Sequence, residues 1–375
     1  MDIKTFVKSV EGELYALLKD LCHIPAPSYK EDARAQYCKK WLCDLGAEGV
    51  YTDKAKNVIF PYNCQGSNDI TAVVAHTDTV FSDLEPMPYK EEDGKIFCPG
   101  VGDDTASLAV MLMCIKYMLK SSVIPQKGIL FVCNSCEEGL GNLLGTRTFM
   151  EEYKGRIKQF ISFDSNIELI ADRCVGSHRY KVSFLTPGGH SYLEFPGTSA
   201  IHAAAKVINK IYSLQLPQKP GEKTTLNVGI VEGGTSVNTI AQSASILCEY
   251  RSTDVECLEY MKKEYFKIFE EANQENVKVL VECVGERPCA DKLDPEKQKA
   301  LAEKCREIIE RVVKTEVEFE SSSTDCNIPL SLGIPAVCVG VYRGSKMHTR
   351  EEYIIKDSVI SGLEVGISLL SELTE

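Results

Sequence analysis

An unbroken apolar run that ends in a histidine and an acid constrains this chain more than any other feature. Ala72-Val73-Val74-Ala75 is continuously hydrophobic, and His76 and Asp78 follow it two residues apart. A run of this kind predicts a strand covered on both faces, because a half-exposed strand alternates instead. Residues i and i+2 of a strand project to the same side. We therefore expect the His76 and Asp78 side chains to leave the strand end together and to face each other.

The residues alone allow two interpretations of this pair. A metal-bound imidazole commonly donates its second ring N–H to a carboxylate, which fixes the tautomer and raises the basicity of the ring. A buried core histidine beside a helix-capping aspartate would look the same in the sequence. The rest of the chain decides between the two.

The composition excludes several classes of protein. The chain has 375 residues, enough for two domains with separate cores, and 44% of them are hydrophobic, which excludes a disordered chain. Its formal net charge is −12 and Lys and Arg are not clustered, which argues against binding to nucleic acid or to an anionic membrane. The N-terminal segment predicts an amphipathic helix without the features of a signal peptide, and no apolar run is long enough to cross a bilayer. We expect a soluble, cytoplasmic protein.

Sixteen cysteines raise the question of disulfides or a zinc site. They are scattered through apolar segments, where a free cysteine behaves as a small buried hydrophobe, and reduced thiols are expected without a secretory signal. The one C-x-x-C, from Cys133 to Cys136, has no second such pair to complete a structural zinc site. We therefore expect free thiols.

An acid pair precedes the most apolar segment of the chain. Residues 105–119 are almost wholly hydrophobic and predict a buried helix. Asp103 and Asp104 would lie at its N-terminus, where a carboxylate accepts hydrogen bonds from free N–H groups and meets the positive end of the helix dipole. We expect one of the two to do no more than cap the helix.

Two further predicted strands also lead into acids. The strand at 128–133 is followed by Glu137 and Glu138, and the strand at 159–163 is followed by Asp164. In an open α/β sheet, ligands bind at the carboxyl ends of the strands. Strands that alternate with helices predict an α/β domain, and one shared site at the strand ends is the simplest explanation for these acids.

The pattern of elements changes between residues 175 and 287. This stretch has the order β-α-β-β-α-β, which is the ferredoxin-like pattern, and the size of a separate domain. The α/β pattern resumes from Pro288. We therefore predict a catalytic domain built from residues 1–174 and 288–375, interrupted by a smaller α+β domain at residues 175–287.

Taken in order, these motifs resemble those of the di-zinc exopeptidase and aminoacylase superfamily, which includes peptidase T, carboxypeptidase G and succinyl-diaminopimelate desuccinylase. Each motif is weak alone, but five in this order and spacing are specific, and they cover nearly the whole chain. The motifs are H-x-D-T-V at 76–80, G-x-G-D-D at 100–104, E-E-G at 137–139, the strand-end Asp164 and the late His348. The GVGDDTA stretch and the late STDCN…GIP…H…EEY run are most similar to the peptidase T branch.

The resemblance implies a fold and a metal site. The fold would be α/β, a mixed-sheet catalytic domain of the zinc-exopeptidase type with an inserted ferredoxin-like α+β domain that serves as lid and dimerisation domain. Two zinc ions are implied, with manganese or cobalt as alternatives. Asp103 would bridge the two ions. The implied ligands are His76, Asp103, Glu138, Asp164 and His348.

The resemblance also implies roles for residues that do not bind metal. Asp78 would orient His76, and Glu137 would act as the general base that activates a metal-bridging water. His190, in the turn TPGGHS, matches a histidine that reaches the partner's active site and stabilises the oxyanion, although an exposed turn histidine is the alternative. Asn238 and Arg251 match substrate-contacting positions. Arg251 could bind a substrate carboxylate or be a strand-end surface residue.

Two enzymatic functions follow from the resemblance. The first is a cytoplasmic di-zinc aminopeptidase that acts on di- or tripeptides, similar to peptidase T. The alternative is a deacylase or desuccinylase of N-acyl amino acids, and Asp325 is a candidate for the acid that would bind a substrate ammonium and so separate the two. A non-catalytic scaffold would need a missing ligand or base, and none is missing. We expect a homodimer formed through the inserted domain, and neither nucleic acid nor membrane as a partner.

Overall fold

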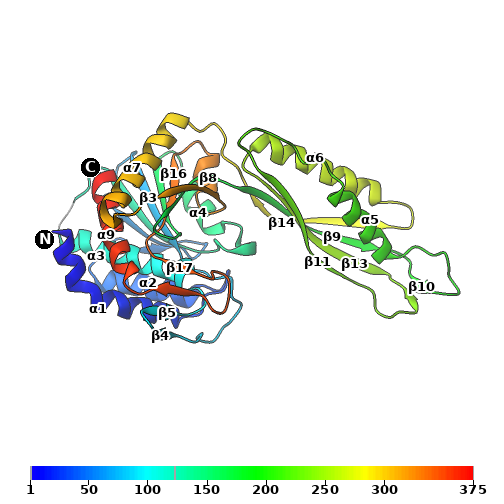
Figure 1. Cartoon of the computed structure of the whole chain (residues 1–375), viewed down its shortest axis with the longest axis horizontal. Helices are drawn as coiled ribbons and strands as arrows, with labels where there is room; N and C mark the ends of the chain where they lie inside the picture. The colour runs from blue at the N-terminus through cyan, green and yellow to red at the C-terminus, as the bar shows by residue number, and fades with distance from the viewer. Residues whose placement is uncertain (1, 122–123, 375) are drawn as a thin grey trace. The chain divides into compact units, whose positions relative to one another are not determined.

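A computed structural model describes residues 2–121 and 124–374 of the chain. These residues form two compact units, each with its own hydrophobic core. The first unit combines the chain up to Cys174 with the chain from Asp291 onward, and the second is Val175–Ala290, coloured green to yellow in Figure 1.

The first unit is built around an eight-stranded mixed sheet in the order β1-β2-β6-β3-β7-β16-β8-β15. The strands are β1 (Tyr51–Thr52), β2 (Val58–Tyr62), β6 (Gly128–Asn134), β3 (Ile70–His76), β7 (Ile157–Phe163), β16 (Ala336–Val339), β8 (Leu169–Cys174) and β15 (Glu318–Ser322). The four central strands β6, β3, β7 and β16 run parallel, whereas β2 and β8 join them antiparallel. The carboxyl ends of the central strands therefore lie at one edge of the sheet. This mixed α/β architecture confirms the predicted fold class.

Strands β3 and β6 are buried along their whole length, as the unbroken apolar runs predict. Helix α3 (Ser107–Lys120) packs against β3 and against α1 (Ile3–Cys22) and α9 (Ser358–Leu373), and α9 also contacts α7 (Pro295–Val313). The remaining helices of this unit are α2 (Asp32–Asp44), α4 (Leu144–Glu152) and the short α8 (Asn327–Ser331). Within the described residues, no helix is both long enough and apolar enough to cross a membrane.

A small antiparallel sheet joins an early part of the first unit to a late one. Its order is β17-β18-β5-β4, made of β17 (Gly344–Ser345), β18 (Tyr353–Ile355), β5 (Lys95–Phe97) and β4 (Lys90–Glu92). The pairing of β18 with β5 places the chain before β18 next to the chain after β5. The turn that leads to α3 is thus brought beside the loop that contains His348.

The second unit has the predicted ferredoxin-like arrangement. Its sheet is antiparallel in the order β11-β13-β9-β14, and α5 and α6 pack against the two central strands β9 and β13. The two central strands alternate between buried and less buried residues, because the two helices cover only one face of the sheet. Elements of this unit are β9 (Gly176–Leu185), α5 (Ala200–Tyr212), β11 (Thr224–Gly233), β13 (Ser243–Ser252), α6 (Val255–Ala272), β14 (Lys278–Arg287) and a two-stranded ribbon of β10 (Gly189–His190) with β12 (Thr239–Ile240).

Helix α9 approaches the chain after β16 so closely that only glycine fits between them. A Cβ atom added to Gly362 would lie 1.6 Å from the Val341 carbonyl oxygen, whereas one added to Gly12 of α1 would meet nothing within 4 Å. We therefore expect Gly362→Ala to destabilise the first unit by about 1–3 kcal/mol or more through overpacking. Gly12→Ala is the matched control and should stabilise the unit by about 0.5–1 kcal/mol, because alanine favours helix.

Denaturant unfolding followed by circular dichroism measures both changes. If the two alanine variants shifted the unfolding midpoint equally, the close approach at Gly362 would not be what restricts this position.

Candidate functional site

The residues predicted to act together lie at the carboxyl edge of the central strands. His76 is the last residue of β3, and Asp164 follows β7 directly. Glu137 and Glu138 come three and four residues after the end of β6, and Asp103 lies in the irregular turn before α3. Parallel strands place their carboxyl ends together, so these side chains meet although they are far apart in sequence.

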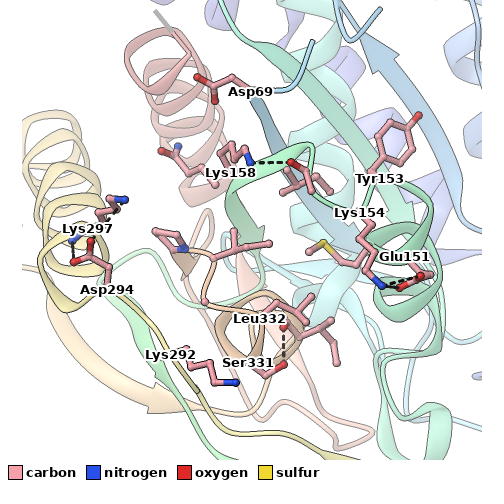
Figure 2. A pocket seen from close by; sticks show the side chains of 18 of the residues that line it. Asp69, Glu151, Tyr153, Lys154, Lys158, Lys292, Asp294, Lys297, Ser331 and Leu332 are labelled. Carbon is pink, nitrogen blue, oxygen red and sulfur yellow. Dashed lines mark hydrogen bonds and ion pairs between the residues drawn. The ribbon is translucent and has the colours of Figure 1, made fainter. Parts of the chain in front are cut away.

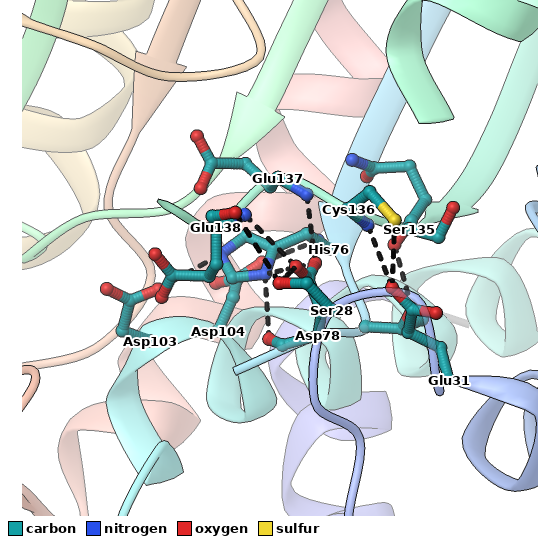
Figure 3. A network of polar contacts seen from close by, with 12 residues as sticks. Ser28, Glu31, His76, Asp78, Asp103, Asp104, Ser135, Cys136, Glu137 and Glu138 are labelled. Atoms are coloured by element: carbon teal, nitrogen blue, oxygen red, sulfur yellow. Dashed lines mark hydrogen bonds and ion pairs between the residues drawn. The ribbon is translucent and has the colours of Figure 1, made fainter. Parts of the chain in front are cut away.

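Each oxygen of the Asp103 carboxylate meets a different histidine. His76 Nε2 lies 2.9 Å from Asp103 Oδ1, and His348 Nε2 lies 2.9 Å from Asp103 Oδ2. Glu138 Oε1 lies 3.3 Å from the same His348 nitrogen. Figure 3 shows the side chains of His76, Asp103 and Glu138 gathered at this point. The two ring nitrogens thus converge on one carboxylate from opposite sides.

Three sets of side chains place possible metal-ligand atoms within 4.8 Å of one another. They are His76 with Asp103 and Asp164, Asp103 with Glu138 and His348, and His76 with Glu137 and Glu138. The first two sets share Asp103 and together contain all five side chains that the sequence named as ligands. The third set contains Glu137, the predicted general base, next to His76 and Glu138.

The site crowds several acids into a buried space. Burial raises the pKa of Glu138 to about 7, and the nearby Asp103 and Glu137 carboxylates raise it as well. Burial, together with neighbouring aspartates, also holds the pKa of Asp164 well above its usual range. Hydrogen bonds to Asp103 and Glu138 raise the pKa of His348 to about 10. Buried carboxyl groups that repel each other in this way are typical of a site for divalent cations. The positive charge of the ions replaces the protons that would otherwise neutralise the carboxylates.

Asp78 is fully buried and holds the turn that carries the two glutamates. Its Oδ1 accepts the Glu137 backbone N–H at 3.0 Å, and its Oδ2 accepts the Glu138 N–H at 3.0 Å and the Ser28 hydroxyl at 2.6 Å. His76 Nδ1 lies 3.0 Å from the backbone oxygen of Asp78 and 3.4 Å from its Oδ1. Asp78 therefore faces the His76 ring, but its shortest hydrogen bonds go elsewhere.

Some residues that shape the site were missed or misjudged in the sequence. Asp104, expected at most to cap a helix, accepts the His76 backbone N–H at 2.9 Å. Arg34 is buried in α2 and donates to the backbone oxygens of Thr77 and Leu21, both at 2.9 Å. Their partners are backbone groups, which leave no pattern in a sequence. Hydrophobic periodicity could therefore not have found them.

Asp325 does not present its carboxylate for a substrate ammonium. The residue is only 1% exposed, and its oxygens accept hydrogen bonds from Asn134 Nδ2 at 2.7 Å and from the Thr146 hydroxyl at 2.5 Å. Burial raises the pKa of Asp325 to about 7, and the nearby Glu137 carboxylate contributes to the rise. The Asp325 carboxylate therefore accepts hydrogen bonds inside the fold. Its presence does not distinguish an aminopeptidase from a deacylase.

The three residues expected from the inserted domain fall into two places of the second unit. His190 and Asn238 are neighbours, because β10 pairs with β12 and the Ser191 N–H donates to the Asn238 carbonyl at 3.0 Å. Arg251 lies near the opposite end of β13, where its guanidinium binds Glu249 at 2.8 and 3.1 Å. Within this unit, Arg251 is thus separate from the other two and already holds a carboxylate.

A hollow lies at the other edge of the large sheet. Its volume is about 1120 Å³, and it is lined by residues such as Asp69 and Pro335, which precede β3 and β16. Figure 2 shows Lys154 beside Glu151, 3.1 Å away, and Lys297 beside Asp294, 3.7 Å away. None of the candidate catalytic residues lines this hollow. The candidate catalytic residues lie instead at the opposite edge, around Asp103.

Comparison with known proteins gives a family match over most of the chain. The model of peptidase family M20/M25/M40 matches residues 72–374. Among curated relatives, the protein YqjE of Bacillus subtilis (strain 168) is 25% identical and the match covers 96% of this chain and 98% of that protein. Acetylornithine deacetylase from Myxococcus xanthus is 26% identical over 57% of this chain and 56% of its own length.

Solved structures share the fold over nearly the whole chain. Aminopeptidase PepT from Bacillus cereus ATCC 10987 has a TM-score of 0.75 and 23% identity, covering 97% of this chain and 99% of its own. A tripeptidase from Staphylococcus aureus subsp. aureus Mu50 has a TM-score of 0.78 and 23% identity, covering 97% of this chain and 98% of its own. At these identities the likeness shows a common fold.

The variant Asp325→Asn tests the cost of ionising this buried acid. With a folded pKa of about 7 against a usual value near 4, Asp325 keeps its proton near pH 5 and loses it near pH 8. Its contribution to stability is present below the unfolded pKa and is lost as the pH rises through about 7. Asparagine stays neutral, so the stability of the variant relative to wild type should increase between these two pH values.

Urea unfolding of the metal-free protein near pH 5 and pH 8 measures this difference, and Asp69→Asn at an exposed position is the control. A relative stability that did not change with pH would show that Asp325 does not titrate in this range.

Proposed function

The chain belongs to peptidase family M20/M25/M40, close to the peptidase T branch, and we propose that it is a di-zinc aminopeptidase acting on di- and tripeptides. Membership makes it a metal-dependent hydrolase of peptides. The observation that carries the finer proposal is the Asp103 carboxylate, whose two oxygens each face the ring nitrogen of a different histidine. Such a carboxylate suits a bridge between two metal ions.

In the proposal, two ions share Asp103. One would be held by His76 and Asp164 as well, and the other by Glu138 and His348. Imidazole nitrogens and carboxylate oxygens are ligands that zinc accepts, and manganese or cobalt would also fit them. When bound, two such ions polarise a peptide carbonyl and lower the pKa of a water molecule.

Glu137 is proposed as the general base. Its backbone N–H is fixed by Asp78, and the residue is only 5% exposed, so its carboxylate is held beside the ligand set. From there it would take the proton of the attacking water and pass it to the leaving amine. A positioned acid–base group of this kind contributes about 10²–10⁴ in rate.

Substrate contacts are proposed for the second unit. His190, exposed at the paired β10 and β12, would reach the active site of the partner subunit and stabilise the negative charge that develops on the scissile carbonyl oxygen there. Asn238 lies beside it. Arg251 already binds the Glu249 carboxylate, and in the proposal a substrate carboxylate would compete for the same guanidinium.

Peptide hydrolysis is supported by the likeness to an aminopeptidase and a tripeptidase. The likeness to acetylornithine deacetylase favours a second candidate, the removal of an acyl group from an N-acyl amino acid. Both reactions cleave an amide bond with the same metals and base. They differ in whether the substrate presents a free ammonium or an acylated nitrogen.

A substrate panel separates the two candidates. The zinc-loaded protein should release the N-terminal residue from di- and tripeptides, lose this activity on chelation and regain it when zinc is added. Glu137→Gln should lower kcat by about 10²–10⁴ while two metal ions remain bound. Amino-acid release by chromatography and metal content by mass spectrometry are the measurements, with the exposed Glu151→Gln as the control.

If N-acyl amino acids were cleaved and the peptides left intact, the deacylase would replace the peptidase. Wild-type activity in Glu137→Gln would show that another group is the base.

We also propose that the second unit forms a homodimer. Strand β11 lies at the edge of its sheet and exposes Ile230 and Val231 by 48% and 61%. An edge strand with exposed apolar side chains is covered when a second copy pairs with it.

Light scattering should give twice the chain mass of 41.6 kDa, and Val231→Lys should shift the protein toward the monomer. Val281→Lys on β14, the opposite edge, is the matched control, and equal effects of the two would place the interface elsewhere.

A further inference from the structure

Glu352 is a buried acid that the proposed chemistry does not use. It is 1% exposed, lies directly before β18 and follows His348 by four residues. Its neighbour Glu351 has a side chain that is 73% exposed and lies 3.6 Å from Lys346. Two adjacent glutamates thus have opposite environments, and only one of them is turned into the protein.

The Glu352 carboxylate binds the backbone of the turn that carries Asp103. Gly100 N–H donates to Oε2 at 2.8 Å, and Gly102 and Asp103 N–H donate to Oε1 at 2.8 and 3.0 Å. A carboxylate that accepts several backbone N–H groups makes strong, charge-assisted hydrogen bonds. If it were removed, these N–H groups would lose their partner in a buried place, which is costly unless the turn moves to reach water.

The turn is shaped to fit this carboxylate. A Cβ atom at Gly102 would lie 2.9 Å from the Tyr342 ring and 3.1 Å from Glu352 Oε1. Gly100 has φ +75°, and a Cβ there would lie 2.7 Å from Thr79 Cγ2. Both glycines are therefore required by close approach, and the turn has little freedom while Glu352 is in place.

Glu352 and His348 belong to one loop, and both contact Asp103. His348 Nε2 meets the Asp103 side chain, and Glu352 binds the Asp103 backbone N–H. Glu352 is itself fixed, since its carbonyl accepts the Cys98 N–H at 3.3 Å and β18 pairs with β5 next to it. Glu352 thus holds the backbone of the residue whose carboxylate lies between the two histidines.

We propose that Glu352 is a positioning residue that sets Asp103 between His76 and His348 and thereby determines how tightly this cluster binds its metal ions. The inference rests on the proposed function in one respect, that the cluster binds metal. Glu352 would contact neither ion nor substrate and would act only through the backbone of the turn.

The test compares three variants of the full chain, Glu352→Ala, Glu352→Gln and Glu351→Gln. Zinc affinity is measured by competition with a chelator, the cobalt-loaded proteins are compared by their visible absorption spectra, and folding is followed by circular dichroism. We expect Glu352→Ala to weaken zinc binding by about 10–100-fold, as loss of residues that orient metal ligands does. The cobalt spectrum should change with it, because the ligand geometry changes.

Glu352→Gln should weaken binding less, because its amide oxygen can still accept the Gly102 and Asp103 N–H groups while its NH₂ faces the Gly100 N–H. Glu351→Gln should match wild type in affinity and spectrum. If Glu352→Ala does not fold, Glu352→Gln decides by the same two measurements.

Wild-type zinc affinity and cobalt spectrum in both Glu352 variants would overturn the proposal, even if their unfolding temperature were lower, because Glu352 would then be purely structural. A wild-type protein that binds no zinc would overturn the proposed function itself. The two failures are distinguished by measuring the wild type first.

Discussion

The Asp103 carboxylate between His76 and His348 is the contact on which the candidate site depends. It joins segments that are 27 and 245 residues apart in the sequence. Closing such long loops costs conformational entropy, although this cost grows only slowly with loop length. A cluster of buried acids does not offset that cost, because like charges repel and are poorly hydrated. The continuous core beneath the sheet, with β3 and α3 at its centre, provides the stability that holds the acids together.

The strand-end part of the site could be predicted from the sequence because it follows a geometric rule. His76 and Asp164 stand where buried parallel strands end, and the ends of parallel strands meet at one edge. His348 obeys no such rule: it lies in a loop with φ +62°, and only the resemblance to a known family pointed to it. The ferredoxin-like arrangement of the second unit was predictable from the order of its elements, β-α-β-β-α-β, which places the first and third strands at the centre of the sheet.

The supporting residues could not be predicted, because most of their partners are backbone atoms. Asp78 was expected to orient His76, but its hydrogen bonds to the Glu137 and Glu138 N–H groups were not predicted. In the same way, Arg34 binds carbonyl groups and Glu352 binds N–H groups. Every residue type has the same backbone, so such contacts create no spacing or periodicity in the chain. The sequence also does not show where a side chain points: it made Asp325 a candidate for binding a substrate ammonium, but its oxygens are engaged by Asn134 and Thr146.

The adjacent glutamates show how backbone geometry lets like charges stand side by side. Asp78 accepts the N–H groups of both Glu137 and Glu138 at 3.0 Å, so the two backbone units point the same way. Cys136 and Gly139 flank them with left-handed φ values of 56° and 47°, which bend the chain on both sides. Their side chains can then serve different partners, one reaching the His348 set and the other remaining beside His76. An E-E pair in a solvated turn would need none of these constraints, whereas Glu137 and Glu138 are both 5% exposed and both bound through their backbone by Asp78.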